Sequence, residues 1–170
     1  MKDTKDSYEL TKRIRTGIPL AAGIALVLIA PTFIVGIVVV VLAFIGAKEL
    51  TVMLAGNESD SMVMLPKWML PFAALLMGLG ALGGESGLHA TLLISAAGWI
   101  IFELVFTPKN ELSKFTSLGF GLFGMVWIIW SLAHMTLIKD LPGGTALLFY
   151  LLFVISFSDI FAYFGGKRFG

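Results

Sequence analysis

The residues best suited to chemistry follow one another at the C-terminal end of the sequence. They comprise a carboxylate, a phenol, two glycines and two cations, namely Asp159, Tyr163, Gly166, Lys167, Arg168 and Gly170. A carboxylate can hold a divalent metal ion, cations can bind phosphate, and glycine lets the backbone approach a ligand closely. This combination indicates a site for a phosphate-bearing ligand, with Asp159 as its acid. The alternative is that Lys167 and Arg168 only fix the orientation of a membrane-spanning helix.

Acids inside apolar segments are informative, because a charge near the centre of a bilayer costs about 2.5 to 3.5 kcal/mol. Glu49 follows Lys48, so an ion pair at the membrane interface is sufficient to explain it. Glu103 lies within an apolar run, and it either faces a polar interior or reaches the headgroups. Asp159 lies among hydroxyl residues, and by itself it is equally compatible with a helix–helix hydrogen bond and a functional site.

Several other kinds of site are excluded or disfavoured. The sequence has no cysteine, which excludes disulfides, thiolate metal sites and cysteine nucleophiles. His89 and His134 stand apart from other metal-ligating residues, so hydrogen bonding near the membrane surface is the favoured role for each. Two glycine strings have the spacing of the dinucleotide-binding pattern, but they fall in or beside apolar spans rather than in a βαβ unit. We interpret them as helix-packing positions: Gly78, Gly80, Gly83, Gly119, Gly121 and Gly124.

The composition indicates what must position these residues. Of the 170 residues, 58% are hydrophobic and 14% are charged, whereas soluble domains carry about 25% charged residues. One buried core cannot absorb so much apolar surface, so hydrocarbon must be the solvent for much of the chain. The predicted fold class is therefore all-α, a polytopic transmembrane helical protein with about six spans.

The apolar stretches and the breaks between them predict the domain organisation. A cytoplasmic N-terminal arm covers 1–16, a transmembrane helical domain covers 17–164, and the start of a truncated cytoplasmic catalytic loop covers 165–170. Spans are expected near 18–30, 32–54, 68–83, 88–106, 115–135 and 145–164. The first apolar block is either one strongly tilted helix or a tight helical hairpin that turns at Pro31. We favour the hairpin because proline disrupts the helical backbone bonding.

The placement of lysine and arginine predicts the orientation. If the N-terminus is cytoplasmic and each predicted span crosses once, Lys139 is the only basic residue that lies outside. A missing or extra span would spoil this separation. We therefore expect an integral membrane protein with a cytoplasmic N-terminus, which is compatible with a bacterial inner membrane.

The C-terminal stretch resembles the start of the catalytic region of the phosphatidate cytidylyltransferases, which are CDP-diacylglycerol synthases. The residues that match the family's motif, in order, are Asp159, Ala162, Tyr163, Phe164, Gly166, Lys167, Phe169 and Gly170. A weaker likeness lies in the basic run at 12–17 before a paired apolar block, and in Glu49 at the end of that block. Members of the family then continue into a basic Ser/Thr/Lys loop and a glycine- and aspartate-rich signature.

The resemblance implies transfer of a cytidylyl group from CTP to phosphatidic acid, which yields CDP-diacylglycerol and pyrophosphate in phospholipid biosynthesis. It implies Mg²⁺ as cofactor, Asp159 as a catalytic and metal-binding carboxylate, and phosphate contacts from Lys167 and Arg168. Tyr163, Gly166 and Gly170 would complete the substrate-binding residues. The expected partners are CTP, phosphatidic acid and membrane lipid, but not nucleic acid, and a homodimer is left open.

Because the family's later motifs do not occur in this sequence, we expect it to be the N-terminal portion of such an enzyme and inactive alone. The rival interpretation is a non-enzymatic helical membrane scaffold or a transporter component. In that case Glu103 and Asp159 would pack against other helices, and the terminal cations would serve topology alone.

Overall fold

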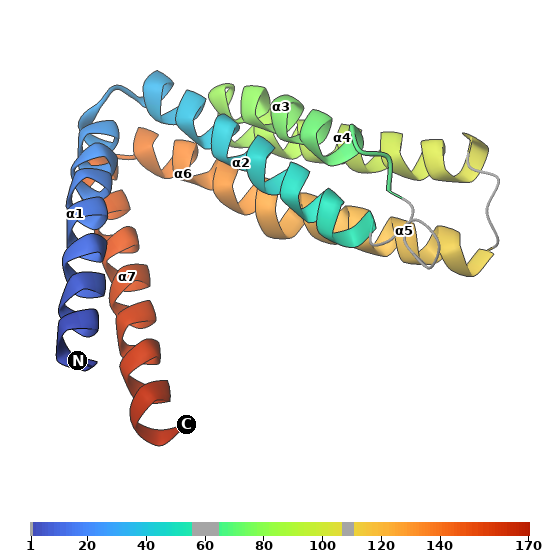
Figure 1. Cartoon of the computed structure of the whole chain (residues 1–170). Helices are drawn as coiled ribbons and strands as arrows, with labels where there is room; N and C mark the ends of the chain where they lie inside the picture. The colour runs from blue at the N-terminus through green and yellow to red at the C-terminus, as the bar shows by residue number, and fades with distance from the viewer. Residues whose placement is uncertain (1, 56–64, 107–110) are drawn as a thin grey trace. The chain divides into compact units, whose positions relative to one another are not determined.

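The computed structural model describes residues 2–55, 65–106 and 111–170, and every regular element in these ranges is a helix (Figure 1). The elements are α1 (Lys2–Ile29), α2 (Thr32–Ala55), α3 (Met69–Leu82), α4 (Gly84–Phe106), α5 (Glu111–Gly124), the π-helix η1 (Met125–Trp130), α6 (Ser131–Asp140) and α7 (Gly144–Phe169). The predicted all-α class is therefore confirmed.

Apolar helical segments occur in the number that the sequence predicts. Four are long and apolar enough to cross a membrane: Thr32–Leu54, Gly84–Phe106, Leu112–Asp140 and Gly144–Arg168. Gly17–Ile29 and Met69–Leu82 are shorter apolar helices. The segment Leu112–Asp140 contains η1, where Ser131 Oγ donates a hydrogen bond to the Val126 carbonyl at 3.0 Å across the five-residue spacing of a π-helix. Together these segments indicate a membrane protein.

Helix extends to both ends of the described chain. α1 begins at Lys2, so the predicted arm is helical over its described residues and runs directly into the first apolar helix. α7 continues to Phe169, whereas the sequence predicts a loop from residue 165. Gly165 and Gly166 do not adopt a positive φ, and the Gly170 N–H donates to the Gly166 carbonyl at 2.9 Å. Helical hydrogen bonding therefore passes through these glycines instead of ending at them.

Proline and glycine end the helices at two of the predicted breaks. Pro31 lies between α1 and α2, and because its ring disfavours helix at the preceding residue, α1 ends at Ile29. The first apolar block thus forms two helices, and not the single tilted helix that was the alternative. Gly84 has a φ of 83°, a left-handed conformation that glycine adopts without a steric penalty. The turn before α4 is consequently shorter than expected, since α4 begins at Gly84 rather than near residue 88.

The helices form two compact units, which we call the two-helix unit and the bundle unit. The two-helix unit contains α1 and α7, which run antiparallel, and both chain ends lie at the same end of this pair (Figure 1). Leu28 and Leu148 are buried there, but most of the apolar side chains of α7 remain exposed. The bundle unit contains α2 to α6.

α3 supplies more of the core of the bundle unit than any other helix, and it packs against α2, α4, η1 and α6. Its buried residues combine large side chains with alanine and glycine: Met69, Leu70, Pro71, Ala73, Ala74, Met77, Gly78 and Ala81. Large apolar side chains such as Ile37 of α2 and Ile101 of α4 are exposed on the outside of the bundle. An apolar outer surface around a close-packed interior is suited to lipid as the surrounding solvent.

Glycines allow the helices of the bundle unit to approach closely, as the sequence predicts for most of the string at 78–83. A Cβ added at Gly78 would collide with Val40 of α2, and one added at Gly80 would lie 2.6 Å from the Gly87 carbonyl oxygen of α4. The prediction is wrong for Gly119, because no described atom lies within 4 Å of a Cβ added there.

Replacing Gly80 with alanine should lower the free energy of unfolding by about 1–3 kcal/mol, the usual effect of overpacking. The reason is that the new methyl group would have to displace the backbone of Gly87 as well as the side chain of Thr91. Thermal unfolding of the detergent-solubilised chain, followed by circular dichroism, measures the change. Gly119→Ala is the matched control, and it should be neutral or stabilising by up to about 1 kcal/mol, because alanine favours helix. Equal melting temperatures for the two variants would contradict the close approach of α3 and α4.

Candidate functional site

The predicted site residues lie on the last turns of α7, where they are exposed. A helix turns by about 100° per residue, so Asp159, Tyr163, Gly166 and Gly170 fall within about 60° of one another around the helix axis. Tyr163 is 57% exposed, and its ring contacts that of Phe164 edge-on. The helix thus gathers the acid, the phenol and two glycines on one face, which we call the Asp159 stripe.

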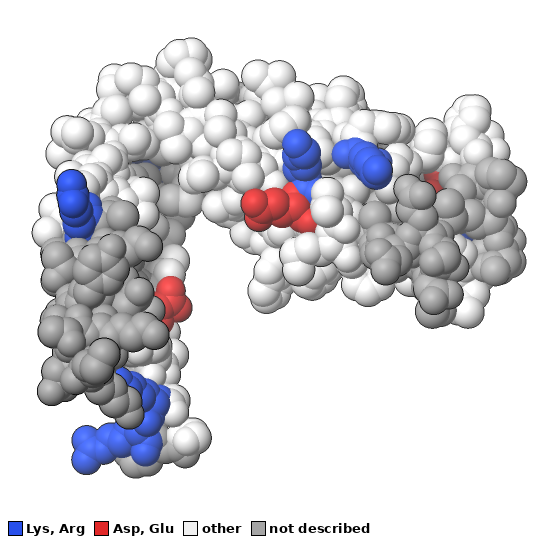
Figure 2. All heavy atoms as spheres, in the orientation of Figure 1, with Lys and Arg blue, Asp and Glu red and all other residues white. Residues whose placement is uncertain are grey.

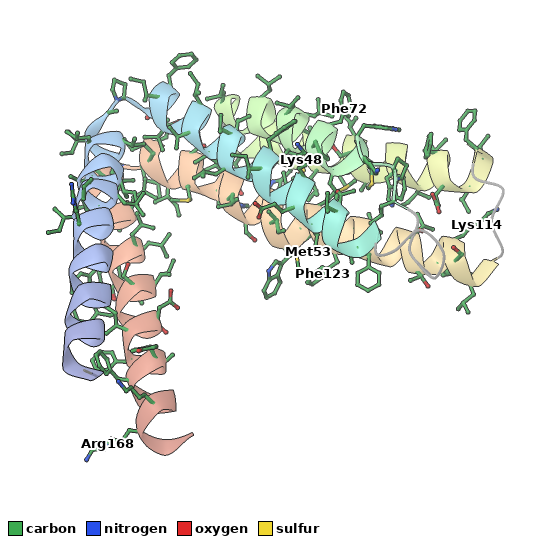
Figure 3. The ribbon with its side chains drawn as sticks, viewed as in Figure 1. Lys48, Met53, Phe72, Lys114, Phe123 and Arg168 are labelled. Atoms are coloured by element: carbon green, nitrogen blue, oxygen red, sulfur yellow. The ribbon has the colours of Figure 1, made fainter. Side chains whose placement is uncertain are left out.

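The same geometry separates the two cations that follow the stripe. Lys167 lies about 80° from Asp159 and borders the stripe, whereas Arg168 lies about 180° from Asp159, on the opposite face of α7. Both side chains are exposed, and Figure 3 shows Arg168 at the C-terminal end of the helix. A ligand held on the Asp159 stripe would therefore meet Lys167 before Arg168.

The Asp159 stripe does not face α1. An apolar groove runs between α1 and α7, and Ser156 and Ile160 line it together with aromatic rings such as Phe153 and Phe157. Around the axis of α7, the mean direction of these groove-lining residues is about a quarter of a turn away from Asp159. Asp159 is exposed, and no described residue forms a hydrogen bond or an ion pair with it. Within the two-helix unit, the stripe is consequently an open face with an accessible carboxylate.

The described residues provide no complete metal site. No group of three or more His, Cys, Asp or Glu side chains lies close enough together in these ranges to hold an ion. His134 instead makes a hydrogen bond within its own helix, with Nδ1 2.8 Å from the Trp130 carbonyl. Mg²⁺ is usually bound through one or two carboxylates, several waters and substrate phosphates. Asp159 fits as one such carboxylate, but it cannot be the whole coordination shell.

Glu103 lies in the interior of the bundle unit. A Cβ added at Gly121 of α5 would collide with the indole of Trp99, so α4 and α5 are in contact at this level. One turn further along α4 and one turn back along the antiparallel α5, Glu103 and Ser117 reach the same level, and both are completely buried. Of the two alternatives for Glu103, the polar interior is therefore confirmed and the headgroup position is wrong.

One cluster in the bundle unit was missed by the sequence analysis. Lys48 of α2 and Lys67, next to Trp68 at the start of α3, line a single groove between these helices. In the sequence the lysines served only as indicators of orientation. The signal that could have revealed the cluster is their position on either side of one connecting loop, because antiparallel neighbours bring such residues to similar levels.

The comparisons with known proteins bear on the whole chain. A model of the cytidylyltransferase family matches residues 11–170, a range that includes the Asp159 stripe and the helices of the bundle unit. No curated protein and no solved structure matches the chain. The family transfers nucleotidyl groups with CTP as a substrate, which agrees with a phosphate-binding site and favours an enzyme over a scaffold. Since the match extends over nearly all of its residues, the chain belongs to the cytidylyltransferase family.

Proposed function

We propose that this chain contributes to an integral membrane enzyme that transfers the cytidylyl group of CTP to phosphatidic acid, forming CDP-diacylglycerol for phospholipid biosynthesis. The observation that carries the proposal is the Asp159 stripe, which lies within the range matched by the family and at the end of a long apolar helix. A lipid acceptor and a dissolved nucleotide can meet only near the membrane surface. The end of a membrane-spanning helix is the kind of position from which both are within reach.

The proposed reaction is a substitution at the α-phosphorus of CTP. A phosphate oxygen of phosphatidic acid attacks this phosphorus, and the bond to the oxygen that bridges the α- and β-phosphates breaks. Pyrophosphate leaves with that bonding electron pair, and the lipid phosphate is now joined to CMP. Because the reactants are all anionic, the protein's main tasks are to position them and to offset their negative charge.

The residues of the Asp159 stripe and the adjacent Lys167 would each perform part of these tasks. Asp159 would orient the site and supply one carboxylate to Mg²⁺, and when bound the ion offsets charge on the nucleotide phosphates. Lys167 would form charge-assisted hydrogen bonds to a phosphate at the edge of the stripe. Gly166 and Gly170 leave the helix surface without side chains there, so a ligand can approach the backbone closely. Tyr163 adds a hydroxyl donor between the acid and the glycines.

Asp159→Asn should lower the rate of CDP-diacylglycerol formation about 100-fold, the usual order of effect when one preorganised electrostatic group is removed. The assay follows transfer of label from α-³²P-CTP to phosphatidic acid by the protein expressed from its complete reading frame. Diacylglycerol, which has no phosphate to act as nucleophile, should accept no label. Asp140→Asn makes the same chemical change at the end of α6 and is the control. Unchanged turnover in Asp159→Asn would remove Asp159 from the site.

Lys167→Ala should reduce kcat/KM for CTP at least about tenfold, which corresponds to losing one hydrogen bond to a charged group. Arg168→Ala should change it by less than about threefold, since an exposed cation on the opposite face contributes little. Steady-state kinetics of the two variants at saturating phosphatidic acid make the comparison. Equal losses would show that the ligand is not confined to the Asp159 stripe.

We further propose that the N-terminus is cytoplasmic. Residues 1–170 contain no cysteine, so a single cysteine introduced here is the only thiol within them, which makes the orientation simple to test. An impermeant maleimide should label Asp140→Cys in intact cells, but should label Lys114→Cys only after the membrane is permeabilised. These positions lie near opposite ends of the bundle unit, on α6 and α5 respectively. The reverse pattern of labelling would invert the proposed orientation.

A further inference from the structure

A groove of about 380 Å³ runs along the outside of the bundle unit, between α2 and α3. Its walls are largely apolar and include Phe44 and Val52 of α2 and Phe72 and Leu75 of α3. Thr51 also lines it, but its hydroxyl already donates to the Ala47 carbonyl at 2.8 Å. The volume lies within the range of ligand pockets, about 300 to 1,000 Å³. The walls of the groove therefore suit a hydrocarbon chain better than a polar molecule.

The charge in this groove is positive. Lys67 lies at the end where α3 begins, and Lys48 lines the groove about one turn further along; both side chains are exposed, and neither forms an ion pair with another described residue. Figure 2 shows neighbouring blue side chains on the bundle unit with acidic side chains, in red, directly beside them, and Figure 3 shows Lys48 near Phe72. Glu49 is the next residue after Lys48, but it projects about 100° further around α2.

Backbone groups add to the positive potential at the same end. α3 begins at Met69, directly after Lys67 and Trp68, so the positive end of its dipole lies beside the lysines. The Met69 N–H itself donates to the Pro66 carbonyl at 3.1 Å, so the dipole rather than a row of free donors is what this helix end offers. Trp68 occupies the N-cap position, and its side chain makes no capping hydrogen bond. An anion at this end would consequently face lysine ammonium groups and the positive end of the α3 dipole.

The depth of the lysines agrees with the level of a lipid headgroup. Lys48 lies about 24 Å along α2 from Thr32, and Lys67 lies about 24 Å along the chain direction of α3 from Gly83. Since the hydrocarbon core is about 30 Å thick, long lysine side chains at this depth reach the interface by extending outward. Trp68 is 55% exposed, and a half-exposed tryptophan is typical of that interface.

We propose that this groove binds an anionic membrane phospholipid, with an acyl chain along the apolar walls and the headgroup phosphate between Lys48 and Lys67. Charge complementarity selects the occupant, because a zwitterionic headgroup brings its own cation and a neutral helix face brings no charge, so neither adds net negative charge beside the two lysines. The site lies wholly in the bundle unit and shares no residue with the Asp159 stripe. The proposal that it binds lipid does not rest on the proposed cytidylyl transfer.

Binding of phosphatidylglycerol to the delipidated full chain, measured by native mass spectrometry, tests the proposal. This lipid is anionic but has no phosphate monoester to act as acceptor, so its binding is independent of the proposed reaction. Lys48→Ala and Lys67→Ala should each weaken binding about fivefold, and the double variant about 25-fold, the effect expected for removing cations near an anionic headgroup. Both side chains are exposed, so alanine removes no core packing. Lys114→Ala, on α5 and outside the groove lining, is the charge-matched control.

Two further measurements examine the apolar part of the groove. Leu75→Trp should fill the space between α2 and α3 and weaken phosphatidylglycerol binding without changing the charge. Inorganic phosphate, which has no chain, should not compete. The proposal is overturned if the double lysine variant binds as tightly as the wild type, or if Lys114→Ala loses as much. Competition by inorganic phosphate, or unchanged binding by Leu75→Trp, would equally overturn the seating of an acyl chain in the groove.

Discussion

Hydrocarbon offers no hydrogen-bond partner to a peptide group, and this constraint underlies the whole structure. In a helix each backbone donor and acceptor is satisfied within the same segment, so a chain this apolar forms helices in every described range. The constraint also explains why helix extends further than expected at the C-terminus. At Gly165 and Gly166 no proline removes a donor and no positive φ is adopted, so the hydrogen bonding of α7 continues past them.

Within the bundle unit, association of the helices depends on close contact between small residues. Lipid is as apolar as the core, so burial provides little drive for helices to associate, and dispersion contacts and polar interactions must supply it. Gly80 against Gly87 and Gly121 against Trp99 are the positions where a methyl group would separate the helices. The Trp99 contact also sets the register between α4 and α5. Through that register, Glu103 lies in the interior at the level of Ser117 instead of reaching the headgroups.

The two parts of the chain that bear on function use helix periodicity in different ways. On α7, one helix alone arranges Asp159 and Tyr163 on a single face and directs Arg168 to the other side. In the bundle unit, two helices are required, because Lys48 and Lys67 belong to different elements and meet only at a shared groove. The first arrangement suits a phosphate-bearing ligand that approaches from water. The second suits a ligand that is itself part of the membrane.

The sequence by itself determined the helical class, the number of apolar segments, the break at Pro31 and the family-like motif from Asp159 to Gly170. These features depend on hydropathy and on local backbone chemistry, which act over a few neighbouring residues. The burial of Glu103, the open environment of Gly119 and the groove beside Lys48 were decided only by the tertiary structure. Each depends on which face of a helix meets its neighbour and at what register. That choice is made by contacts between residues far apart in the chain, and the local sequence does not contain it.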